Sequence, residues 1–135
     1  MNTPEDMVCM DVLAAIAWAD GEVSTDEAGT VVDLIDRMDY VDHHRVQEAM
    51  LVPHNMPSKA RLDALSPRLR LRLLHDAYVV AEYCGGVQDA ERELIKTLAA
   101  PLVAAERWPE AEACLKLYVD YERAAERLWG VTHLG

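Results

Sequence analysis

The chain has 135 residues, 51% of them apolar, with six glycines and six prolines, and this composition predicts one globular domain spanning residues 1–135. The formal net charge of −11 makes nucleic acid an unlikely class of partner, because phosphate binding needs positive charge. No apolar run approaches the roughly 18 residues that a membrane-spanning helix needs, so we expect a protein that does not span a membrane.

Apolar residues recur at helical spacing through the first half of the chain. Thr3 followed by Pro4 predicts the start of a helix that runs to about residue 19. Further helices are expected over about 25–38 and 43–51, separated by a short break at 39–42.

The second half of the chain is also expected to be helical: a short helix after Ser58, a long one over about 67–83, one from about 89 to Pro101, and a last one over about 109–129. In the long helix, alternating Arg68, Arg70 and Arg72 predict a solvated face. The expected buried stripe of the last helix is Cys114, Leu117, Tyr118, Tyr121, Ala125 and Leu128. No segment shows strand alternation, so the predicted fold class is all-α, a compact bundle of six to eight helices.

The stretch from Asp20 to Glu27 joins the first two helices and carries four carboxylates. Gly21 can end a helix in the left-handed conformation, and Ser24 with Glu27 forms a capping-box pattern that opens the next one. Asp20 and Glu22 lie at the carboxyl end of the first helix, where the helix dipole disfavours negative charge. A cation would relieve this repulsion, so we predict a weak calcium or magnesium site with Asp20, Glu22, Asp26 and Glu27 as ligands.

This corner matches only the second half of a calcium-binding EF-hand loop, with Gly21 at its sixth position and Glu27 at its twelfth. The first and third positions of that loop would be Ile16 and Trp18, which cannot bind calcium. A true EF-hand is therefore rejected, and the remaining site would be a partial one. A metal-free interpretation stays open, in which Gly21 only ends a helix and Glu27 only belongs to a capping box.

A shift of 64 residues brings part of the chain onto itself and predicts two similar helix–corner–helix units. The matched pairs are Ala17 with Ala81, Gly21 with Gly85, Val23 with Val87, Glu27 with Glu91, Val31 with Ile95 and Leu34 with Leu98.

This doubled corner resembles the tellurite-resistance protein B (TerB) family, whose hallmark is an Ala-x-x-Asp-Gly-x-x-x-x-x-Glu corner that usually occurs twice. The first copy is matched by Ala17, Asp20, Gly21 and Glu27, and the second by Ala81, Gly85 and Glu91. The resemblance covers about residues 7–100 and leaves out the last helix. Cys84 replaces the second aspartate, which puts a second cation site in doubt.

The resemblance implies a compact, non-enzymatic helical bundle. It also implies divalent-cation binding at the acidic corner and a role in stress-response complexes near the inner membrane.

Charge is spread unevenly along the chain: residues 1–36 hold nine carboxylates and no lysine or arginine. This acidic region predicts contact with a protein partner that is either basic or bridged by a cation. Trp129, near the end of the last helix, is expected to be partly exposed and to take part in such a contact. Three widely spaced cysteines and the absence of a basic N-terminal signal predict reduced thiols and a cytoplasmic location.

The pattern of titratable residues does not predict an enzyme. A metal-dependent hydrolase would use Asp20 and Glu22 with His43 or His44, but these residues show no catalytic spacing. His75 beside Asp76 is unlike a catalytic pair, because neighbours on a helix point apart. Cys84 is either a reactive thiol or, more commonly at such a position, a small packed one. The function predicted is therefore a non-catalytic interaction module, and the alternative is a purely structural subunit without metal.

Overall fold

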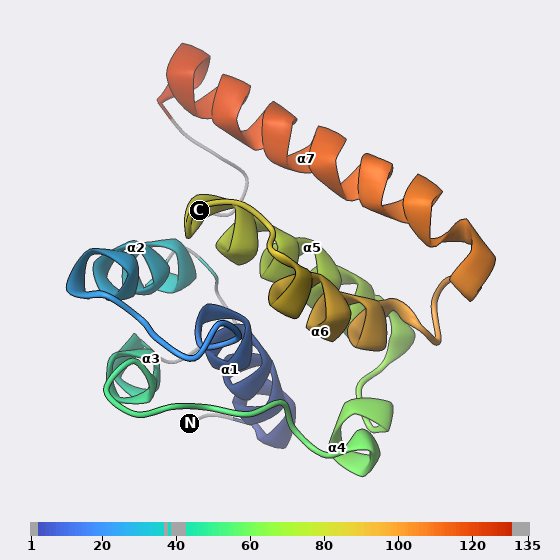
Figure 1. Cartoon of the computed structure of the whole chain (residues 1–135), viewed down its shortest axis with the longest axis horizontal. Helices are drawn as coiled ribbons and strands as arrows, with labels where there is room; N and C mark the ends of the chain where they lie inside the picture. Colours follow the sequence, from blue (N-terminus) through green and yellow to red (C-terminus); the bar gives the residue numbers. More distant parts are fainter. Residues whose placement is uncertain (1–2, 37, 39–42, 131–135) are drawn as a thin grey trace.

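The computed structural model describes residues 3–36, 38 and 43–130. Over these residues the chain forms seven α-helices and one short 3-10 helix, so the all-α prediction is confirmed (Figure 1). The elements are α1 (Pro4–Ala17), α2 (Thr25–Asp36), α3 (His43–Ala49), α4 (Lys59–Asp63), α5 (Pro67–Tyr83), α6 (Asp89–Ala99), η1 (Ala105–Arg107) and α7 (Trp108–Trp129). The break predicted at 39–42 lies outside the described residues.

Local capping bonds explain why these helices begin where the sequence predicts. Asp6 N donates to Thr3 Oγ1, and Thr3 N donates to Asp6 Oδ2, both at 3.1 Å, so α1 opens with a complete capping box. Ser58 and Ser66 each accept a backbone hydrogen bond at the start of α4 and α5. α1 ends at Ala17, two residues before the predicted end, because the chain tightens into a turn before the glycine corner.

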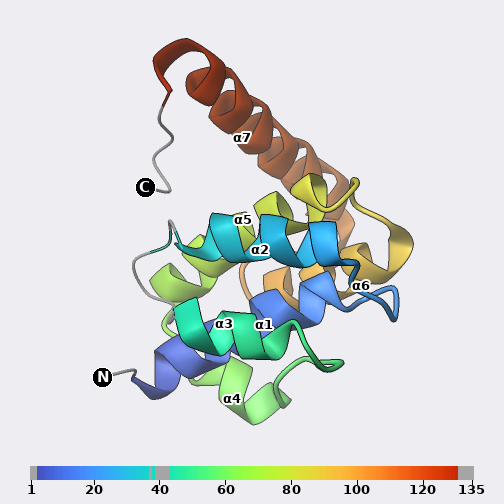
Figure 2. The same ribbon diagram turned by 90° about the vertical axis from the view of Figure 1, so that its left-hand side faces the viewer.

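The helix α1 lies at the centre of the bundle and packs against α2, α3, α5 and α6 (Figures 1 and 2). It is apolar almost all round, which is the pattern of a helix buried on most of its surface. The largest fully buried apolar side chains of the core are Leu13, Ile16, Ile35, Leu73, Ile95 and Leu98.

Arg70 is buried, with 5% of its surface exposed, so its prediction as part of a solvated face was wrong. Its guanidinium donates to the carbonyl oxygens of Leu98 at 2.7 Å, Leu62 at 2.9 Å and Thr97 at 3.2 Å. These carbonyls lie near the carboxyl ends of α4 and α6, where helical partners run out. Arg70 therefore joins three helices, although burial lowers its pKa.

The buried stripe predicted for α7 was also wrong in part. The residues of α7 that are buried are Trp108, Leu115, Val119, Glu122 and Ala125. Cys114, Leu117, Tyr121 and Leu128 are exposed instead, whereas Tyr118 is half-buried. The helix has two apolar faces, and only the face with the buried residues packs inward. Figure 1 shows α7 lying along α5. Trp129 is 72% exposed, in line with its predicted accessibility.

Among the described helices, none combines the length and the apolar character needed to cross a bilayer.

Candidate functional site

The acidic corner between α1 and α2 is a tight turn supported by its own carboxylate. Gly21 has a φ of +91°, and its N–H donates to the Trp18 carbonyl at 2.9 Å. Asp20 Oδ1 accepts a hydrogen bond from Glu22 N at 3.1 Å. One oxygen of Asp20 thus stabilises the turn itself, which gives this residue a role that needs no metal.

The start of α2 carries the other two predicted ligands. Ser24 Oγ accepts from Glu27 N at 3.1 Å, which is the forward bond of the predicted capping box. Asp26 is exposed and Glu27 is half-buried.

The four predicted ligands are spread over the corner and the first turn of α2. Within the described part of the chain, no three or more Asp, Glu, His or Cys side chains lie where they could hold one metal ion. The side chain of His43, a candidate in the hydrolase alternative, lies outside the described residues.

The second corner, between α5 and α6, turns through Gly85 and Gly86 at φ +105° and +97°. Here Glu91 Oε1 accepts from Gln88 N at 3.2 Å. Burial, together with the negative charges of Glu27, Glu91 and Asp20, raises the pKa of Cys84 to about 12. Cys84 thus remains protonated at neutral pH, which favours a packed thiol over a reactive one.

A groove of about 690 Å³ lies between α2 and α3, beside the acidic corner. Its apolar lining comes from both helices and their ends: Val23, Ala28, Val32, Met50 and Leu51. Its polar lining comprises Ser24, Thr25 and Asp33 at and along α2, and His44, Gln47 and Glu48 from α3.

The walls of this groove are fixed to the rest of the bundle. Trp18 Nε1 donates to the carbonyl of Ala49 at 2.9 Å, which attaches the end of α3 to the end of α1. Just beyond this bond, Leu51 and Val52 are 79% and 56% exposed. The groove therefore continues into an apolar edge that faces solvent.

Gly29 gives the groove part of its width. It lies inside α2, lines the groove, and a Cβ atom added to it would meet nothing within 4 Å. A glycine inside a helix costs roughly 0.5–1 kcal/mol relative to alanine, so this position keeps open space at the expense of helix stability.

The sequence predicted the acidic residues of the α1–α2 corner beside this groove, but it did not predict the lining that α3 contributes. Gly29 within a helical pattern and the pair Leu51–Val52 directly after a helix were the available signals.

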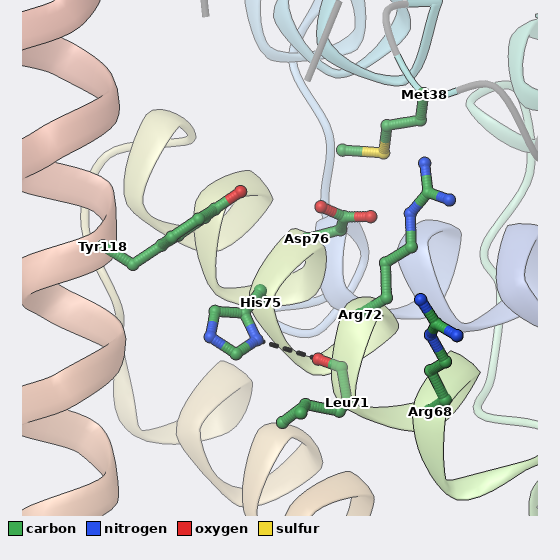
Figure 3. Close-up of a pocket in the computed structure, with 7 residues that line it drawn as sticks. All are labelled: Met38, Arg68, Leu71, Arg72, His75, Asp76 and Tyr118. Carbon is green, nitrogen blue, oxygen red and sulfur yellow. Dashed lines mark hydrogen bonds between the residues drawn. The ribbon is translucent and has the colours of Figure 1, made fainter. Parts of the chain in front are cut away.

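A second hollow, of about 390 Å³, lies between α5 and α7 (Figure 3). His75 Nδ1 lies 2.9 Å from the Leu71 carbonyl oxygen, and the His75 ring meets Tyr118 edge-on at 4.9 Å. Figure 3 shows the Asp76 carboxylate on the side of Arg72, away from the His75 ring. The two neighbours therefore point apart, and the residues that line this hollow include no serine or cysteine nucleophile.

In comparison with known proteins, no protein-family model, curated protein or solved structure matches the chain.

Proposed function

We propose that this chain is a non-catalytic protein-interaction module that binds a basic amphipathic segment in the α2–α3 groove. The observation that carries the proposal is the groove itself, in which an apolar lining is bordered by carboxylates from both helices. Such a surface suits an amphipathic helix whose apolar face enters the groove while its basic face meets the acidic edge.

The size of the groove supports a peptide-like occupant. A hollow of about 690 Å³ between two helices leaves room for several side chains of a partner. Exposed Leu51 and Val52 extend the apolar surface beyond it. Two or three apolar side chains of a partner could be buried there together.

The charge around the groove supports a basic partner. Asp33 and Glu48 line the groove from opposite helices, and Asp26 is exposed directly after the lining residue Thr25. The nine carboxylates of residues 1–36, without lysine or arginine, add a long-range negative field. This field should accelerate association at low salt more than it strengthens the final complex.

The resemblance to the TerB family is consistent with an interaction module and extends the proposal to a stress-response complex close to the inner membrane. The three cysteines are free, which suits the cytoplasm. A divalent cation at the Asp20–Glu27 corner would then bridge an acidic partner in place of a basic one. A chelator distinguishes the two modes, because it releases only the bridged partner.

Substitutions at Gly29 test the groove directly. The probe is a labelled amphipathic helical peptide with leucines on one face and lysines and arginines on the other. Gly29→Leu fills the groove without backbone strain and should weaken binding at least tenfold, whereas Gly29→Ala should leave affinity almost unchanged. Equal affinities for both variants, measured by fluorescence anisotropy, would exclude the groove as the binding site.

A charge substitution tests the acidic edge. Asp33→Lys with Glu48→Lys should reduce the association rate and affinity strongly, and should flatten the dependence of the rate on salt. The matched control is Glu5→Lys with Glu106→Lys, which changes net charge equally on exposed residues away from the groove. If both double variants lose the same affinity, only the overall charge matters and the proposed site is wrong.

A further inference from the structure

The outward face of α7 carries large apolar side chains that the bundle does not cover. Leu117, Tyr121 and Leu128 are 69%, 61% and 73% exposed. Single exposed apolar residues are common, but these three lie on one helix and on one side of it.

These residues belong to a stripe with heptad spacing. The stripe, called here the α7 seam, consists of Cys114, Leu117, Tyr121, Ala124 and Leu128. Its steps of three and four residues alternate, as they do in the contact line of a coiled coil. The face of α7 that packs inward is formed by other residues, Leu115, Val119 and Glu122 among them.

The position of α7 leaves this seam open to a partner. α7 lies at the edge of the bundle against α5, and its last turns extend beyond the neighbouring helices in both views (Figures 1 and 2). It has 22 residues, so a second helix of equal length can lie along it for several turns.

Charges beside the seam are self-complementary in one orientation only. Asp120 and Arg127 lie on the same flank, one heptad apart. If two copies of α7 pair antiparallel, with Leu117 facing Leu128 of the other copy and Tyr121 facing Ala124, then Asp120 faces Arg127 twice. A parallel pair would instead place Asp120 beside Ala125, and it would set Cys114 against Cys114.

We propose that the α7 seam binds the same seam of a second copy of this chain, in an antiparallel coiled-coil pair flanked by two Asp120–Arg127 ion pairs. The inference concerns a surface separate from the α2–α3 groove and does not depend on the proposed function. A seam of five residues per chain makes an interface at the small end of specific ones, so association should be weak and dependent on concentration.

Sedimentation analysis of the full chain from about 1 to 500 μM tests this pairing. We expect a monomer–dimer equilibrium in the micromolar range. Leu117→Lys and Leu128→Lys should each weaken it at least tenfold, whereas Leu71→Lys, at an exposed leucine of α5 outside the seam, should not. Far-UV circular dichroism checks that each variant is folded. A monomer at every concentration, or equal loss in the Leu71 control, would overturn the proposal.

Charge reversal and cross-linking test the orientation. Asp120→Arg should weaken the dimer, and adding Arg127→Asp should restore it, because the two ion pairs re-form with reversed signs. With Cys114 changed to Ser, Leu117→Cys combined with Leu128→Cys should give a disulfide-linked dimer on mild oxidation, whereas each single cysteine variant should not. Efficient cross-linking through native Cys114 or through Leu117→Cys alone would show a parallel pair and refute the antiparallel one.

Discussion

The corner between α1 and α2 and the corner between α5 and α6 both reverse the chain through glycine at positive φ: Gly21 at +91° in the first, and Gly85 at +105° with Gly86 at +97° in the second. Behind each corner, the equivalent residues Val31 and Ile95 are fully buried. The two units therefore share the requirements of the turn and of the core.

The polar groups at the two corners differ. In the first, Asp20 supports the turn and Ser24 caps α2. In the second, Cys84 occupies the place of Asp20, and the Glu91 carboxylate accepts from the backbone at the start of α6. The two corners therefore share the residues set by backbone geometry and burial, while their exposed polar groups differ.

Substitution of the equivalent core residues should have the largest effect. Ile95→Ala should lower the free energy of unfolding by about 4 kcal/mol and Val31→Ala by about 2 kcal/mol, since both leave cavities and isoleucine loses more volume. Urea denaturation measures both. A cost below about 1 kcal/mol at one site only would show that the two cores are not equivalent.

Removal of Arg70 should lower the free energy of unfolding by breaking contacts that the first unit lacks. The position 64 residues earlier is Asp6, a capping residue of α1, so the first unit has no counterpart. Arg70→Met should cost about 3 kcal/mol because three backbone carbonyls lose their donor. Arg68→Met, at an exposed position of the same helix, should change stability by less than about 0.5 kcal/mol. Similar values for the two variants would mean that Arg70 does not join the helices.

Replacement of the turn glycine should cost a similar amount of stability at each corner. Gly21→Ala and Gly85→Ala should each cost about 1–2 kcal/mol, because alanine is strained at positive φ. Gly29→Ala, in the interior of α2, should instead stabilise the protein by up to about 1 kcal/mol. Thermal unfolding of the three variants provides the comparison, and a neutral Gly21→Ala would show that the first corner can relax.

Loss of the Ser24 cap at the start of α2 should have a smaller effect on stability. Ser24→Ala should cost about 1 kcal/mol through the lost bond to Glu27 N, and Ser24→Thr should retain most of that stability. An unchanged melting temperature in Ser24→Ala would argue that the cap does not form in solution.

The smallest effect on stability is expected from the carboxylates of the first corner. Asp20→Asn with Glu22→Gln should leave stability unchanged or slightly higher, because asparagine keeps the turn acceptor and the repulsion with the helix dipole is lost. Any calcium or magnesium binding measured by calorimetry should disappear in this variant and persist in Cys84→Ala. Unchanged binding in the double variant would exclude Asp20 and Glu22 as ligands.

The helix ends could be predicted from the sequence because their causes are local. Thr3 and Ser66 cap through residues three positions away, and Gly21 turns the chain after α1 through its own conformation. Arg70 could not be predicted, because the carbonyl that it binds at 2.7 Å belongs to Leu98, 28 residues away.

The candidate site, too, could be predicted from the sequence only in part. The acidic residues of the first corner and of α2 are visible as a run without basic residues. The groove exists only because α3 packs beside α2 and because Trp18 binds the carbonyl of Ala49, 31 positions later. The face of α7 that stays exposed likewise depends on its contact with α5, since both faces of the helix are apolar.

The central place of α1 has a consequence for synthesis on the ribosome. α1 precedes the other described helices in the chain, but the element that covers most of its buried surface is α5, which ends at Tyr83. During translation part of α1 must therefore stay exposed until the 66 residues from Trp18 to Tyr83 have also emerged from the exit tunnel. The acidic segment that follows α1 lies next to this helix in the sequence, and its negative charge would oppose aggregation of nascent chains during that time.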